Sequence, residues 1–204
     1  MLSELQSWIE ETYRLEPEAP VADYLIDRAQ LERHLDKDSP YRNAEEVLLL
    51  RGDAQNCEVG LFLHPKFGLE ETSVAEADTH GVMTALEGVS HLLLSLHRLK
   101  RSEGLTQLEL ELQAEVDKFL FLRLMSDEGR RAEAKRHLLS EANLEGLSRE
   151  NLDRYAAARR LAHRYCRHLE ETYLAPRSFD GLFRELPEFY RMSHWRKLQT
   201  IGLP

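Results

Sequence analysis

The sequence predicts a mainly α-helical (α+β) protein, in which one β-hairpin in the N-terminal half packs against an antiparallel helix bundle. Three observations lead to this fold class. Apolar residues recur with the helical period over most of the chain, strand-like runs are confined to one short stretch, and glycines or prolines separate the periodic segments. With 204 residues the chain is long enough for one domain with a sizeable core.

Two helices are expected before the hairpin. Residues 2–14 carry their apolar side chains on one side of a helix, and "EPEAP" ends this helix. Pro20 suits the first position of a second helix, which the apolar pattern extends to Leu35. The segment "DKDSPYRN" then predicts a loop.

The hairpin is predicted from the apolar runs "EVLLLR" and "CEVGLFLH", separated by "GDAQN". The strands are expected at residues 46–51 and 57–64, with Pro65 ending the second. Apolar residues occupy alternate and intervening positions, so both faces should be covered. Because two strands alone are marginally stable in water, either helices pack on them or a second copy of the chain extends the sheet. The hairpin is therefore one reason to expect a homodimer.

The rest of the chain is expected to be helical, with breaks at Gly104, Gly129 and Gly146. The predicted helices cover residues 77–101, 105–125, 130–142, 148–174, 178–185 and 187–200, the last beginning at Pro187.

Charge is unevenly distributed along the chain. Residues 1–125 hold 12 Lys+Arg and 24 Asp+Glu, whereas residues 126–204 hold 15 and 12. We expect a single domain over 1–204, with a subdivision into an acidic α/β-hairpin part (1–125) and an Arg-rich helical part (126–204) as the alternative. The net charge of −9 argues against nucleic acid as a partner.

The apolar runs are far shorter than the roughly 20 residues of a membrane-spanning helix, so no membrane association is expected. The N-terminus lacks the pattern of a signal peptide. Cys57 and Cys166 are too far apart for a C-x-x-C pair, which favours buried thiols over a disulfide framework. A cytoplasmic location is expected.

One polar stripe on the helix at 77–101 is the first candidate site. It contains His80, Glu87 and His91 and lies nearly opposite the apolar stripe. The spacing of four places Glu87 and His91 on adjacent turns, where they could bind one metal ion or act as an acid–base pair. This spacing matches neither H-E-x-x-H nor the Glu-x-x-His of di-iron bundles. The alternative is a hydrogen-bonded Glu–His pair near Arg98.

The next helix adds Glu111 and Glu115, close to its apolar stripe. A short turn should make the two helices antiparallel, so these carboxylates could meet Glu87 and His91 across the contact. The catalytic candidates are then Glu87, His91 and Glu115, and all four residues are candidate ligands for a divalent metal. The alternative is a structural ion-pair network with Lys118 or Arg98.

Arg160, Arg164 and Arg167 share one side of the helix at 148–174 and are candidates for binding an acidic partner. The alternative is a solvated face with internal ion pairs. His163 and Cys166 are one turn apart, but too few further ligands accompany them for a zinc site.

The sequence contains no phosphate-binding loop, dinucleotide-binding glycine pattern, kinase signature or EF-hand loop. Two function classes remain. The first is a cytoplasmic protein-interaction, regulatory or assembly factor without catalytic activity and without a cofactor. The alternative is a metal-dependent enzyme or small-ligand-binding protein that uses the Glu/His seam between two helices.

Overall fold

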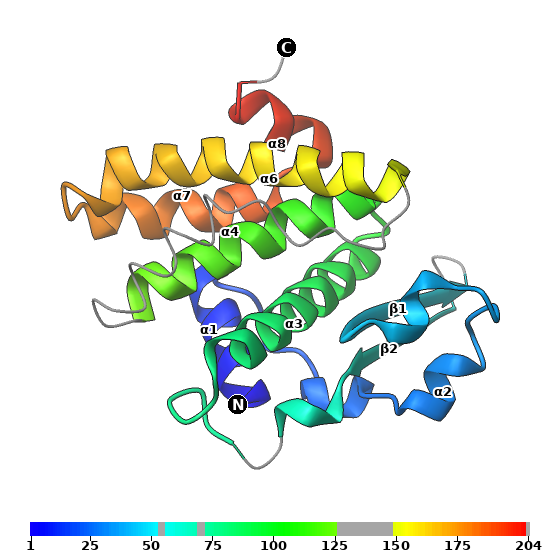
Figure 1. Ribbon diagram of the computed structural model, residues 1–204. Coiled ribbons are helices and arrows are strands. Elements are labelled where there is room, and N and C mark those ends of the chain that lie inside the picture. Colours follow the sequence, from blue (N-terminus) through cyan, green and yellow to red (C-terminus); the bar gives the residue numbers. More distant parts are fainter. Residues whose placement is uncertain (53–55, 69–71, 126–148, 203–204) are drawn as a thin grey trace. The chain divides into compact units, whose positions relative to one another are not determined.

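The structure, a computed structural model, describes residues 1–52, 56–68, 72–125 and 149–202. This described part holds seven α-helices and one antiparallel β-hairpin in the N-terminal half, which confirms the mainly α fold class (Figure 1). The chain forms two compact units. Unit 1 contains Met1–Glu10 and Glu16–Gly104, and unit 2 contains Glu11–Leu15 and Leu105–Pro204. Organisation as one domain, or as parts divided near residue 126, stays a prediction.

Unit 1 contains the hairpin, three short 3-10 helices and three α-helices, of which α1 continues into unit 2. In chain order the elements are α1 (Leu2–Tyr13), η1 (Val21–Tyr24), α2 (Arg28–Glu32), η2 (Pro40–Asn43), β1 (Glu46–Gly52), β2 (Cys57–Leu63), η3 (Pro65–Phe67) and α3 (Thr79–Lys100). The helices predicted at 2–14 and 77–101 are thus confirmed as α1 and α3.

The hairpin strands lie within one residue of their predicted bounds. Their register runs from Glu46 opposite Leu63 to Gly52 opposite Cys57. Gly52 has φ +116°, and a Cβ atom there would lie 2.0 Å from the carbonyl oxygen of Asn56. The turn therefore requires glycine at this position.

Helices cover both faces of the hairpin, as the alternating apolar residues predict. On one face α3 contacts both strands (Figure 1). On the other face Leu31 of α2 packs with Val47 and Phe62 in a buried cluster. Extension of the sheet by a second copy of the chain stays a prediction.

The continuous helix predicted over residues 20–35 is wrong. Its first turn is a 3-10 helix at Val21–Tyr24, after which the backbone becomes extended. The N–H of Ile26 donates to the carbonyl of Leu61 in β2 at 2.9 Å, so pairing with the hairpin replaces helical hydrogen bonds here. A new helix, α2, then begins at Asp27 with a capping box.

Unit 2 is built of helices, including the last residues of α1. Its other described elements are α4 (Gln107–Met125), α6 (Arg149–Leu169), the π-helix η4 (Glu170–Leu174), α7 (Phe179–Arg191) and α8 (His194–Thr200). Helices α4 and α6 pack side by side (Figure 1). They correspond to the predicted helices at 105–125 and 148–174, whereas the helix predicted at 130–142 lies outside the described residues.

The two helices predicted at 178–185 and 187–200 are wrong in their division. Helix α7 runs through Pro187 to Arg191, and the break comes at residues 192–193. A proline removes one backbone donor from a helix. The strongly apolar buried side of α7 outweighs this loss; it includes Leu182, Leu186 and Phe189.

No helix among the described residues is both long enough and apolar enough to cross a membrane.

Candidate metal-binding site

Three side chains of unit 1 converge between the hairpin and α3. They are Glu46, at the start of β1, and Glu87 and His91, one turn apart on α3. One ligand atom from each lies within 4.8 Å of the others. The Nδ1 atom of His91 lies 3.3 Å from Oε1 of Glu46. We call these three residues the Glu–Glu–His cluster.

Close packing of α3 on the hairpin brings the cluster together. Gly88 lies between the two helical members in sequence and faces the strands. A Cβ atom on Gly88 would lie 2.9 Å from Cδ2 of Leu63 and 3.1 Å from Cγ of Glu46. The bare backbone thus allows β1 and its glutamate to approach α3, which accounts for the glycine in mid-helix.

The cluster is largely shielded from water. His91 is buried, with 7% of its side chain exposed, and the Glu46 side chain is 13% exposed. Two carboxylates this close repel each other more strongly in a low dielectric than in water. A protonated imidazole or a bound cation would each compensate that repulsion. The described geometry therefore serves either an ion pair or a metal ion.

The donor types indicate which metal ions would fit. Carboxylate oxygens suit hard ions such as Mg²⁺ and Mn²⁺, whereas imidazole favours Zn²⁺, Fe²⁺ and related transition metals. Three protein ligands leave at least one coordination position for water or a substrate oxygen, as in catalytic zinc sites. Among the described residues, this is the one group of three or more potential ligands at such distances.

The predicted polar stripe of α3 does not behave as one unit. His80 is mostly exposed, and its Nε2 lies 2.7 Å from Oε2 of Glu45. Lys66 also donates to Glu45, and this hydrogen bond, with help from His80, lowers the pKa of that carboxyl group. Arg98, at the other end of the stripe, is buried and paired with Glu103.

The predicted carboxylates of the next helix, Glu111 and Glu115, belong to unit 2. Within that unit, Glu115 accepts a hydrogen bond from Lys118 at 3.0 Å, and its other oxygen lies 3.7 Å from Nε of Arg159. These contacts match the ion-pair network named as the alternative. Convergence of Glu111 and Glu115 with the residues of α3 stays a prediction, while Glu46 is a neighbour that sequence reasoning missed.

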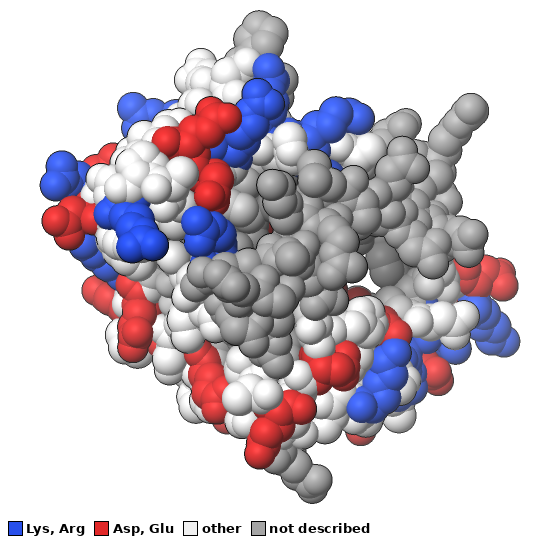
Figure 2. Space-filling model, turned by 60° about the vertical axis from the view of Figure 1, so that its left-hand side comes forward, with Lys and Arg blue, Asp and Glu red and all other residues white. Residues whose placement is uncertain are grey.

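The three candidate arginines of α6, Arg160, Arg164 and Arg167, are exposed. Arg167 forms an ion pair with Glu171 at 3.4 Å, within the same helical segment. On the face shown in Figure 2, basic and acidic side chains of the described residues are interspersed. A role of Arg160, Arg164 and Arg167 in binding a partner stays a prediction.

Sequence reasoning also missed a buried polar network in unit 2. Lys197 of α8 donates to Oε1 of Gln113 at 3.1 Å and lies 3.3 Å from Oε1 of Glu109. Gln113 in turn donates to Asp117 at 2.9 Å and to Tyr13 at 3.0 Å. All five side chains are buried. Burial, together with the negative charge of Asp117, raises the pKa of Tyr13, so its hydroxyl remains a donor.

Two further side chains of unit 2, Cys166 and Tyr190, are held in the interior. Burial raises the pKa of the Cys166 thiol, which disfavours the thiolate that zinc requires. Tyr190 is buried and stacks on Tyr13, with ring centroids 4.5 Å apart. In comparisons with family models, curated proteins and solved structures, no match to this chain was found.

Proposed function

We propose that the chain binds one divalent transition-metal ion through Glu46, Glu87 and His91. The observation that carries this proposal is the convergence of two carboxylates and a buried imidazole within 4.8 Å. The metal would remove the repulsion between the carboxylates and would leave a coordination position open. The chain would then be a metal-dependent enzyme or a small-ligand-binding protein whose substrate contributes an oxygen to the metal.

The affinity for metal should rise with pH through the range in which an ordinary histidine loses its proton, about pH 6.5. A metal ligand must be neutral imidazole, so binding competes with protonation. An ion pair between a protonated His91 and its glutamates would show the opposite trend, since that contact weakens as the proton leaves.

Metal titration tests the proposal directly. The purified chain, stripped with chelator and dialysed, should bind one equivalent of Zn²⁺ or Mn²⁺ in calorimetry. Glu87→Gln and His91→Ala should each lower the affinity at least tenfold. His80→Ala is the matched control, because it removes an exposed histidine of the same helix outside the cluster. The proposal is contradicted if the wild-type protein binds neither ion. It is also contradicted if His80→Ala lowers the affinity as much as His91→Ala does.

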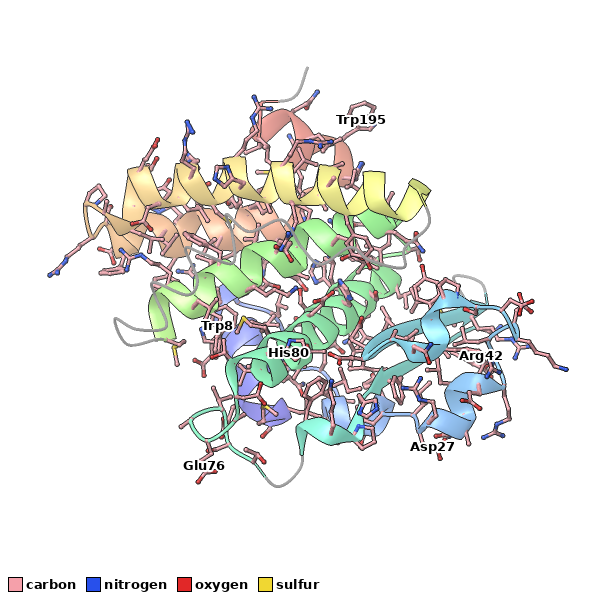
Figure 3. All side chains as sticks on the ribbon, viewed as in Figure 1. Trp8, Asp27, Arg42, Glu76, His80 and Trp195 are labelled. Carbon is pink, nitrogen blue, oxygen red and sulfur yellow. The ribbon has the colours of Figure 1, made fainter. Side chains whose placement is uncertain are left out.

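We also propose a second function for unit 2, as the surface of a cytoplasmic interaction, regulatory or assembly factor. Supporting it are the exposed arginines at 160, 164 and 167 and Trp195 of α8, which is labelled in Figure 3. The residue surface of Trp195 is 68% exposed. Tryptophan and arginine are enriched among residues that dominate binding energy at protein interfaces. The partner would be an acidic protein surface or a second copy of the chain, and the negative net charge disfavours nucleic acid.

Light scattering after size exclusion measures self-association, and affinity capture measures a heterologous partner. Reversing the charge at Arg160, Arg164 and Arg167 should release an acidic partner, and Trp195→Ala should weaken the same complex. A complex that survives both changes would show that the contact lies elsewhere.

A further inference from the structure

Unit 2 contains a cavity of about 370 Å³ formed by α6, α7 and the end of α8. This volume lies near the small end of the range for small-molecule sites, roughly 300–1,000 Å³. Its lining combines charged residues with aromatic and aliphatic ones. The residues that bear on its ligand are Arg164, Tyr165, Glu188, Phe189, Met192 and Ile201. The cavity is separate from the Glu–Glu–His cluster, all of whose members belong to unit 1.

On one side of the cavity, the polar side chains already form hydrogen bonds with neighbouring residues. His168 has Nε2 3.1 Å from Oε1 of Glu185 and Nδ1 3.2 Å from the hydroxyl of Thr172. Glu185 also accepts a hydrogen bond from Tyr173 at 2.6 Å. These groups hold α6, η4 and α7 together, so they shape the cavity and leave ligand recognition to other side chains.

Two other charged residues, one basic and one acidic, also line the cavity. Arg164 and Glu188 are both exposed at the cavity, and neither forms an ion pair with any other residue that the structure describes. A ligand that carries one anionic and one cationic group would complement both. A simple anion or a simple amine would leave one of them without a counter-charge.

Tyr165 supplies a buried hydrogen-bond donor in the same cavity. Its residue surface is 1% exposed, and its hydroxyl makes no hydrogen bond of good geometry to a described residue. Burial and the Glu185 carboxylate, through its charge and as a nearby hydrogen-bond acceptor, raise the pKa of Tyr165, so the hydroxyl keeps its proton. Glu185 is already engaged by His168 and Tyr173, so a ligand oxygen would give the buried hydroxyl a better acceptor.

Apart from Thr200, the rest of the lining is apolar. Phe189 stacks on Tyr165 with ring centroids 3.7 Å apart, and Met192 and Ile201 complete an aliphatic side. A ligand for this cavity therefore needs a small apolar body in addition to its two charges.

We propose that this cavity binds a small zwitterion of the amino-acid class with an apolar side chain. The carboxylate pairs with Arg164 and the ammonium group with Glu188. The Tyr165 hydroxyl donates to a carboxylate oxygen, and the ligand's side chain packs on Met192 and Ile201.

Calorimetry with the full-length protein tests the proposal using L-phenylalanine, L-leucine and L-methionine as probes. At least one of the three amino acids should bind. Two truncated analogues of L-phenylalanine test the contributions of the carboxylate and the ammonium group one at a time. Phenethylamine lacks the carboxylate, 3-phenylpropionate lacks the ammonium group, and each should bind at least tenfold more weakly. Arg164→Gln should abolish the advantage of the amino acid over the amine, and Glu188→Gln its advantage over the carboxylic acid.

Two further variants keep the test decisive. Tyr165→Phe should weaken amino-acid binding about threefold to tenfold, the effect of losing one hydrogen bond, and circular dichroism confirms that the variant folds. If the hydroxyl were only an unsatisfied group of the core, this variant would bind all probes as before. Arg160→Glu/Arg167→Glu should retain amino-acid binding, which separates the cavity from the proposed interaction surface. Failure of all three amino acids to bind at millimolar concentration, or equal binding of the truncated probes, overturns the proposal.

Discussion

Replacing Lys197 by methionine is expected to destabilise unit 2 strongly at pH 7. Lys197 and Glu109 are both completely buried, and Nζ lies 3.3 Å from Oε1. Methionine keeps the length and apolar character of the lysine stem but removes the ammonium group. The variant thus leaves the Glu109 carboxylate in the interior without that cation.

Removing one partner of a buried ion pair costs about 3–5 kcal/mol, because the remaining charge is left in a medium of low dielectric constant. We expect the penalty of Lys197→Met to fall in this range at pH 7.

Urea denaturation followed by far-ultraviolet circular dichroism at pH 7 measures the effect. Arg167→Met is the matched control, since its ion pair with Glu171 is exposed and should contribute at most about 0.5 kcal/mol. Glu109→Met/Lys197→Met should regain most of the loss, because both charges are gone. A Lys197→Met penalty below about 1 kcal/mol, or an equal penalty in the double variant, would contradict this account.

Three further outcomes are expected. Gly88→Ala should destabilise the fold by about 1–3 kcal/mol, because its Cβ would approach the hairpin to 2.9 Å, whereas Gly104→Ala, with open space around it, should be neutral or stabilising in the same urea assay. Asp27→Ala should cost about 1 kcal/mol by removing the capping box of α2, seen as faster amide exchange in that helix. A hydrogen bond from Lys66 lowers the pKa of Glu45. The ionised Glu45 carboxylate therefore contributes to stability above about pH 4.3, and this contribution is lost as pH falls through the lowered pKa. Glu45→Gln should therefore lose less stability than wild type between pH 5 and 3, and an identical acid transition would contradict this.

The hairpin and most helices were predictable because their signals are local. Alternating apolar residues predict β1 and β2, and the predicted break at Gly104 lies between α3 and α4. The breaks predicted at Gly129 and Gly146 lie outside the described residues. The segment at 20–35 failed because a helical pattern of apolar residues does not reveal that Ile26 hydrogen-bonds to β2. At Pro187 a new helix was predicted to begin, but α7 continues through this residue, because burial of its apolar side outweighs one missing backbone donor.

Helix α4 shows why periodicity did not find its buried polar network. Buried residues occur around much of its circumference, so the apolar pattern does not indicate which polar positions face inward. Glu111 and Glu115 were singled out, whereas Glu109, Gln113 and Asp117 are the fully buried residues. Their repeat of four residues was the available signal. This repeat indicates a buried network only together with Lys197, which lies more than 80 positions along the chain from Gln113 and donates a hydrogen bond to it.

The positions of Glu87 and His91 on adjacent turns could be read from their spacing of four residues, which has that consequence in any α-helix. That Glu46 joins them could not be read from any local pattern. Its approach depends on how closely the hairpin packs on Gly88. Periodicity describes side chains along one element, while distances between elements follow from the packing of all the side chains around them.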